Sequence, residues 1–154
     1  MAGRGDRSVR GRSLARKFAM QALYQWLLTG QDYAELVAQF ADDEYYPDVD
    51  AEYFGGLLRA VLDDSARLDE ELAGLIDRPV AQLDPVEHAV LLVGLAELAG
   101  HPEIPFRVVI SEGIELARRF GATDGHKFVN AVLDRAARQH RAAEIEAGRQ
   151  ARSG

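Results

Sequence analysis

Apolar residues along this chain recur every three or four positions, which is the spacing of a helix with one buried face. Between Leu14 and Leu28 an apolar residue returns at every fourth position. Ser13 can cap the start of this segment, and Gly30 can end it. The pattern therefore predicts an amphipathic helix over residues 14–28.

Turn signals divide the rest of the chain into further helical segments. The sharpest boundary is "LDPVEHAV", where Asp84, Pro85 and Glu87 form an Asp version of the capping box. The predicted segments are residues 33–40, a helix from Ala51 (capped by Asp50) that continues to Ile76 with a kink near Ser65, residues 85–99, residues 105–120, and residues 125–140 behind a Thr123/Asp124 cap. No strand pattern of useful length is present. About seven helices with short connections predict an all-α bundle.

Length and composition favour one domain with its own core, since the chain has 154 residues of which 47% are apolar. We expect an all-helical domain over residues 13–141, a flexible basic arm at 1–12 and a frayed tail at 142–154. The longest apolar run is too short to span a bilayer, so a cytoplasmic protein is expected. The absence of Cys excludes disulfides and thiolate metal sites.

Charge is distributed unevenly in this acidic chain of net charge −7. The first 17 residues contain Arg4, Arg7, Arg10, Arg12, Arg16 and Lys17 against Asp6 alone. Residues 31–77 contain fourteen acids against two arginines. This asymmetry indicates an end that binds anions on a body that repels them. A solvated, disordered terminus is the alternative explanation of the basic arm.

Catalytic signatures are lacking. There is no P-loop, no dinucleotide fingerprint and no nucleophile elbow, and the four histidines form no His-x-x-x-His pair. A hydrolase built from two remote carboxylates stays open, because sequence spacing does not show which helices meet. We therefore expect no enzyme activity, no cofactor and no metal.

Four blocks, in order and in register, resemble the NusB family of bacterial transcription antitermination factors. They are "RSLARKFAMQALYQW", "DAEYFGGLLRAV", "VEHAVLLVGLAEL" and "IPFRVVISEGIELARRFGATDGHKFVNAVLD". The resemblance covers Arg12 to His140, and it implies two small helical bundles. It also implies a factor that binds single-stranded boxA RNA together with NusE, a small-subunit ribosomal protein. The pair acts on the RNA polymerase elongation complex with other Nus factors, which promotes transcription of ribosomal RNA operons.

The resemblance also assigns a set of RNA-binding residues. They are Arg7, Arg10, Arg12, Arg16, Lys17, Tyr24, Lys127 and Phe128. The cations would meet phosphates, and the aromatic rings would stack on bases. Tyr24 follows Lys17 by almost two helical turns, so the two share a face; a tyrosine at the edge of the core is the alternative. Phe128 is expected to serve the core as well.

Glu87 and Asp124 are assigned to the protein partner or to hydrogen bonds with bases. Each also has a local explanation, because Glu87 suits a capping box and Asp124 a helix cap. An acidic docking face would suit a basic NusE surface.

The sequence departs from the family pattern at several positions. Glycines dilute the basic arm, and Gly113 stands inside a predicted helix, where Gly costs about 1 kcal/mol relative to Ala. Two further possibilities stay open: an RNA-independent protein-interaction adaptor, and a homodimer that hides the basic face.

Overall fold

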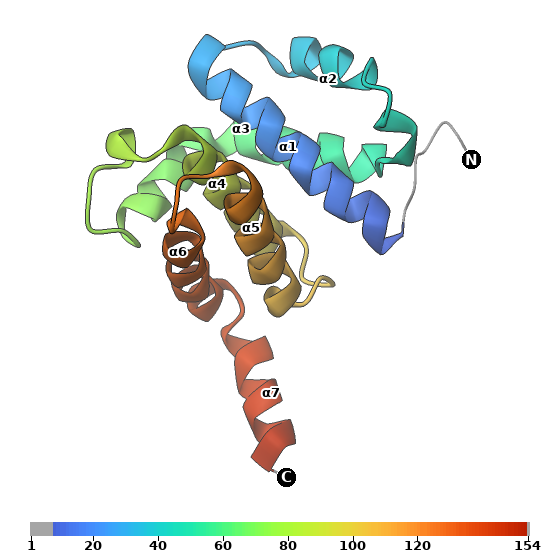
Figure 1. The fold of residues 1–154 in the computed structure, drawn as a ribbon. Helices are drawn as coiled ribbons and strands as arrows, with labels where there is room; N and C mark the ends of the chain where they lie inside the picture. Colours follow the sequence, from blue (N-terminus) through green and yellow to red (C-terminus); the bar gives the residue numbers. More distant parts are fainter. Residues whose placement is uncertain (1–7, 154) are drawn as a thin grey trace.

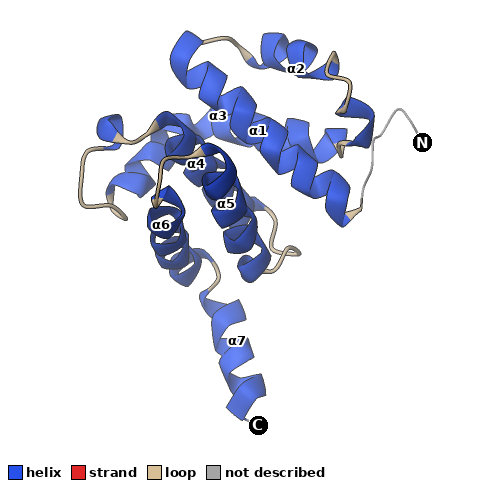
Figure 2. Cartoon of the chain, in the orientation of Figure 1, coloured by secondary structure: helices blue, strands red, loops and turns tan. Residues whose placement is uncertain are grey.

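Residues 8–153 are described by a computed structural model, and over this range the chain is helical with no strand. The α-helices are α1 (Val9–Thr29), α2 (Tyr33–Ala41), α3 (Ala51–Ala73), α4 (Pro85–Gly100), α5 (Phe106–Phe120), α6 (Gly125–His140) and α7 (Ala142–Ser153). Two short 3-10 helices, η2 (Tyr46–Asp48) and η3 (Val80–Gln82), lie in the connections (Figure 2). The all-α prediction is confirmed.

Helix α4 is the centre of the molecule (Figure 1). Every residue from Glu87 to Leu98 is buried, because α4 is apolar on all sides and has neighbours on all sides. Helices α1 and α3 pack on one part of its surface, and α5 and α6 on another. The two small bundles that the resemblance implies are therefore α1–α3 and α4–α6, joined through α4.

Helix α1 begins earlier than predicted. Its cap is Ser8, whose hydroxyl accepts the N–H of Gly11 at 3.3 Å, and it ends at Gly30 with φ 74°. The prediction that Ser13 caps the helix is wrong, because the Ser13 hydroxyl donates to Glu112 instead. Residues 9–12, expected in a flexible arm, form the first turn of α1. Residues 1–7 lie outside the described range.

Aromatic rings fasten α1 to the smaller helices beside it. The ring centroid of Phe18 lies 5.6 Å from that of Phe40 in α2 and 6.1 Å from that of Phe54 in α3. Tyr46 of η2 contacts the same rings. This cluster holds the short α2 segment in place, since edge-to-face pairs add to the burial of their apolar surface.

Helix α3 starts where the sequence predicts and bends where a kink was expected. The Asp50 carboxylate accepts the N–H of Tyr53, and Asp64 has φ −131° inside the helix. The carboxylate of Asp64 is bound by Arg67 at 2.6 Å. The helix ends at Ala73, slightly before the predicted end at Ile76.

The C-terminal tail is helical in the structure rather than frayed. Helix α7 projects away from the bundle (Figure 1), and none of its residues is buried. Its first turn is tied down by Glu144, which accepts the N–H of Phe106 at 3.0 Å and pairs with Arg141 at 2.6 Å. The prediction of a frayed tail did not include these two contacts. The bond to the Phe106 N–H joins α7 to the start of α5.

Candidate nucleic-acid interface

Helix α1 displays most of the predicted RNA-binding residues that the structure describes. Arg10 is exposed and pairs loosely with Asp48 at 3.6 Å, while Arg12 and Lys17 are half-exposed. Tyr24 is 38% exposed, and it is not among the aromatic residues packed on the core. Arg7 falls outside the described residues.

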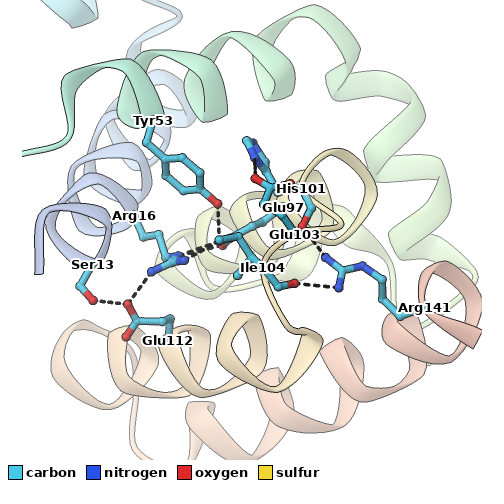
Figure 3. A network of polar contacts seen from close by, with 9 residues as sticks. All are labelled: Ser13, Arg16, Tyr53, Glu97, His101, Glu103, Ile104, Glu112 and Arg141. Atoms are coloured by element: carbon cyan, nitrogen blue, oxygen red, sulfur yellow. Dashed lines mark hydrogen bonds and ion pairs between the residues drawn. The ribbon is translucent and has the colours of Figure 1, made fainter. Parts of the chain in front are cut away.

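Arg16 is a correction to the predicted surface. It is 3% exposed, and its guanidinium lies between two carboxylates in the interior (Figure 3). Its Nη2 lies 2.6 Å from Glu97 and its Nη1 lies 2.7 Å from Glu112. Burial acts to lower the pKa of Arg16, but the hydrogen bonds and charges of Glu97, with the charge of Glu112, raise it overall. Arg16 therefore joins α1 to α4 and α5 and does not point outward at phosphate.

Glu97 is the centre of this internal network. Its carboxylate is 1% exposed and accepts hydrogen bonds from two guanidinium nitrogens of Arg16 (Figure 3). It also accepts a hydrogen bond from the Tyr53 hydroxyl at 2.6 Å. Burial, with the hydrogen bond to Glu97, raises the pKa of Tyr53 far above its ordinary value of 10.0. The hydroxyl therefore stays protonated and donates to Glu97 across the physiological range.

Arg141 holds the connection between α4 and α5. Its guanidinium is buried and donates to the backbone carbonyls of Leu98, His101 and Ile104 at 2.8–2.9 Å. Figure 3 shows Arg141 beside His101 and Ile104. Those three carbonyls follow or end α4, where helix geometry leaves acceptors without partners. The first turn of α5, which borders the candidate surface, is thereby fixed relative to α4.

Two hollows lie between α1 and α5. One, of about 420 Å³, lies at the first turns of both helices, with Val9, Arg12, Arg107 and Val108 in its lining. The other is narrower and has Lys17 of α1 and Arg119 of α5 in its lining. Each hollow is therefore lined by cations from both helices, together with Glu112, and these cations suit contact with phosphates.

The start of α6 holds the second group of predicted residues. Lys127 is exposed and its Nζ lies 3.3 Å from the Asp124 carboxylate, which is also exposed. Phe128 is half-buried, and the guanidinium carbon of Arg78 lies 4.2 Å from its ring centroid. Asp124 occupies the N-cap position at φ 65°, but its side chain makes no capping bond. The prediction of a side-chain cap at Asp124 is therefore wrong.

Glu87 is placed differently from the prediction. Asp84 caps α4 as expected, accepting the N–H groups of Val86 and Glu87 at 2.9 and 3.2 Å. The Glu87 carboxylate, however, turns toward the loop before α6, where it lies against Gly125 and where the Ala122 backbone acts to lower its pKa. It lies against Gly125 so closely that a Cβ there would clash with it. At 5% exposed, Glu87 offers a partner little surface.

Burial and the nearby Asp84 charge raise the pKa of Glu87, although the Ala122 N–H and Arg78 act in the opposite direction. Glu87 thus ties the start of α4 to the start of α6, and it fixes the loop that carries Asp124 and Lys127.

The comparisons decide the family, because the sequence matches the NusB family over residues 13–138. The chain belongs to the NusB family. The transcription antitermination protein NusB of Bordetella pertussis is 48% identical over 145 residues, which is 92% of this chain and 93% of that protein. The NusB of Alcanivorax borkumensis is 50% identical over 133 residues, which is 86% of this chain and 89% of that protein.

Solved NusB structures share the fold. The T. maritima NusB has a TM-score of 0.76 at 28% identity and covers 84% of this chain and 92% of its own. A chain from a crystal structure of the antitermination factors NusB and NusE in complex with dsRNA has a TM-score of 0.71 at 23% identity. The match covers 86% of this chain and 99% of that chain. The predicted NusB-like, all-helical architecture is thus confirmed.

Sequence analysis missed two cations of this NusB-family surface. Arg119 is exposed on α5 and lines the narrower hollow with Lys17, and Arg78 lies over Phe128. Both were passed over because neither lies in the basic arm. For Arg119 a signal existed, since "ARRF" places it in the block that most resembles the family.

The described residues contain no metal-binding cluster of three His, Cys, Asp or Glu side chains. None of the helices formed by residues 8–153 combines the length and apolar character needed to cross a membrane.

Proposed function

We propose that this chain is an antitermination factor that binds single-stranded boxA-type RNA together with a NusE-type ribosomal protein. It would act in the cytoplasm on the RNA polymerase elongation complex, without catalysis and without a cofactor. Membership of the NusB family supports the role, since the relatives are named transcription antitermination proteins. The solved complex of NusB and NusE with RNA supports the choice of partners.

The exposure of Tyr24 is the observation that carries the proposal for this chain. A tyrosine of the core would be packed, whereas this ring is 38% exposed on the α1 face that also carries Lys17. An exposed ring beside cations is how proteins hold single-stranded nucleic acid without reading every base.

For the protein partner we propose Asp124 as the direct contact, because its carboxylate is exposed at the start of α6. Glu87 would act through position, since it holds the loop on which Asp124 stands. A basic NusE surface would meet Asp124 by charge complementarity, which affects the rate and the register of association.

Binding of labelled boxA RNA, with and without NusE and at several salt concentrations, tests the proposal. With Arg16 inside the protein, about four phosphate contacts are expected. The slope of the logarithm of the binding constant against the logarithm of the salt concentration should then be about −2.8. A slope near zero, or equal affinity for a scrambled RNA, would contradict RNA binding.

Tyr24→Ala should weaken boxA binding by about 1–3 kcal/mol if the ring stacks on a base. Tyr45→Ala is the matched control, because Tyr45 is 54% exposed but lies in the acidic connection between α2 and α3. Fluorescence anisotropy measures both. Equal affinities for the two variants would return Tyr24 to a structural role.

Substitutions in the first turn of α1 distinguish the RNA-binding proposal from the RNA-independent adaptor better than a long deletion does. Removing residues 1–12 would also remove the first turn of α1 and the bond from the Asp50 N–H to the Gly11 carbonyl at 3.1 Å. The double variant Arg10→Gln, Arg12→Gln keeps this turn. The RNA proposal predicts lost RNA affinity with intact partner binding, and the adaptor predicts the reverse.

A further inference from the structure

Arg78 and Phe128 form a cation–π pair at the edge of the candidate surface. The guanidinium carbon lies 4.2 Å from the ring centroid, so the cation lies on the face of the ring. Phe128 is half-buried at the start of α6, whereas Arg78 is exposed in the segment between α3 and η3. The Phe128 ring, which sequence reasoning assigned to stacking on a base, is therefore already in contact with Arg78.

The Arg78 guanidinium makes no hydrogen bond or ion pair with another residue between 8 and 153. Its charge acts against the rise in the pKa of Glu87, but that carboxylate is buried. The Arg78 side chain is exposed, so its guanidinium, which lies over the Phe128 ring, remains accessible to a ligand.

A flat cation held in this way suits a nucleobase. Bases of single-stranded RNA stack on arginine planes as well as on aromatic rings, and the N–H groups at the edge of the plane can donate to base oxygens or phosphate. The Phe128 ring restricts the orientation of the arginine, which lowers the entropy lost when a base stacks on it. Nearby, Lys127 exposes its ammonium for the backbone of the same strand.

We propose that Arg78, lying on Phe128, forms a base-stacking site for single-stranded RNA. This inference rests on the proposed RNA-binding function and deepens it. The RNA base would lie on the outer face of Arg78, so that base, guanidinium and Phe128 ring form three layers. Phe128 then supports the site from below and does not touch the base.

The chain supplies a matched control in Arg59. Its guanidinium carbon lies 3.8 Å from the Tyr33 ring centroid, so it is also an exposed arginine on an aromatic ring. Arg59, however, is paired with Asp63 at 3.9 Å and lies on α3, in the acidic part of the chain. Removing it changes the net charge by the same amount as removing Arg78.

The test compares Arg78→Ala, Arg78→Lys and Arg59→Ala in the full chain with its NusE partner, using labelled boxA RNA. Arg78→Ala should weaken binding by about 5- to 150-fold, the range for loss of a base-stacking side chain. Arg78→Lys keeps the charge but loses the flat cation, and should lose most of the same affinity. Arg59→Ala should bind as the unsubstituted protein does.

A scan of abasic positions along the RNA identifies the stacked base. At one position, removal of the base should weaken RNA binding to the unsubstituted protein. For the Arg78→Ala variant, removal of the same base should leave the affinity unchanged. Circular dichroism melting checks that the variants are folded, which is expected because Arg78 is exposed.

The outcomes separate this site from the function on which it rests. Suppose that the unsubstituted protein prefers boxA RNA and that Tyr24→Ala lowers the boxA affinity but Arg78→Ala does not. In that case the Arg78 site is wrong and the RNA function stands. If Arg78→Lys binds normally, Arg78 acts by charge alone and the stacking site is wrong. If the unsubstituted protein does not distinguish boxA from scrambled RNA, both proposals fail.

Discussion

The buried Arg16 links α1 to α4 and α5. Arg16 is enclosed by Glu97 of α4 and Glu112 of α5, so its charge serves the interior although it follows a run of basic residues. Removing one partner of such a group leaves the other charge buried without compensation, which is far more harmful than removing both.

Arg16→Ala should therefore lower the free energy of unfolding by about 3–5 kcal/mol. The reason is that Glu97, 1% exposed, would keep only Tyr53 as a side-chain partner. Urea denaturation followed by circular dichroism measures the change. The double variant Arg16→Met, Glu97→Leu removes both charges and should recover most of the loss. If the double variant were less stable than Arg16→Ala, the internal ion pair would be a net stabilising element.

Sequence reasoning placed Arg16 on the RNA-binding surface, and it failed there for one physical reason. The partners of Arg16 lie 81 and 96 residues away, and no local pattern reports them. A partial signal was present, since Arg16 stands three and seven positions before Ala19 and Leu23, both fully buried. That spacing puts Arg16 on the inner face and leaves Lys17, one position on, turned away from it.

At the scale of elements, helix boundaries were predicted well wherever turn chemistry is unambiguous. Asp84 with Pro85 marks the start of α4, and Pro105 and Gly121 bracket α5 as expected. The start of α1 was missed because Ser8 and Ser13 are equally good caps in sequence, and only the contact to Glu112 removes Ser13 from that role.

Glycines inside helices have two different explanations in this fold. A Cβ on Gly94 of α4 or Gly113 of α5 would meet the Leu133 side chain of α6 at 2.6 or 2.7 Å. These glycines allow three helices to approach closely around Leu133. Gly113, which looks unfavourable from its helix propensity, is thus explained by packing, whereas Gly56 of α3 faces open space.

Gly94→Ala should lower the free energy of unfolding by about 1–3 kcal/mol, because the core around Leu133 would be overpacked. Gly56→Ala is the control and should raise it by about 0.5–1 kcal/mol, because only helix propensity changes there. Thermal and urea denaturation of both variants provide the comparison. Stabilisation by Gly94→Ala would show that α4 and α6 can move apart freely.

At the scale of the molecule, the two bundles share α4 and cannot exclude water separately. Its residues from Glu87 to Leu98 are buried by helices from both sides. Parts of a protein that share a buried element are expected to unfold together.

Trp26, the single tryptophan, lies in α1 and reports on the first bundle, while far-ultraviolet circular dichroism reports on all helices. The two signals should give the same urea midpoint, and amide hydrogen exchange should be slowest in α4. An earlier transition of Trp26 fluorescence would show that the first bundle unfolds alone.

The central position of α4 has a consequence during synthesis on the ribosome. Helices α1 and α3 are complete by Ala73, yet the helix that covers their inner faces ends only at Gly100. At roughly 5–20 residues per second, translation of the intervening stretch takes roughly 1–5 s. For that time the nascent chain presents the apolar faces of α1 and α3 that later pack on α4. We expect a chaperone at the tunnel exit to bind this early surface.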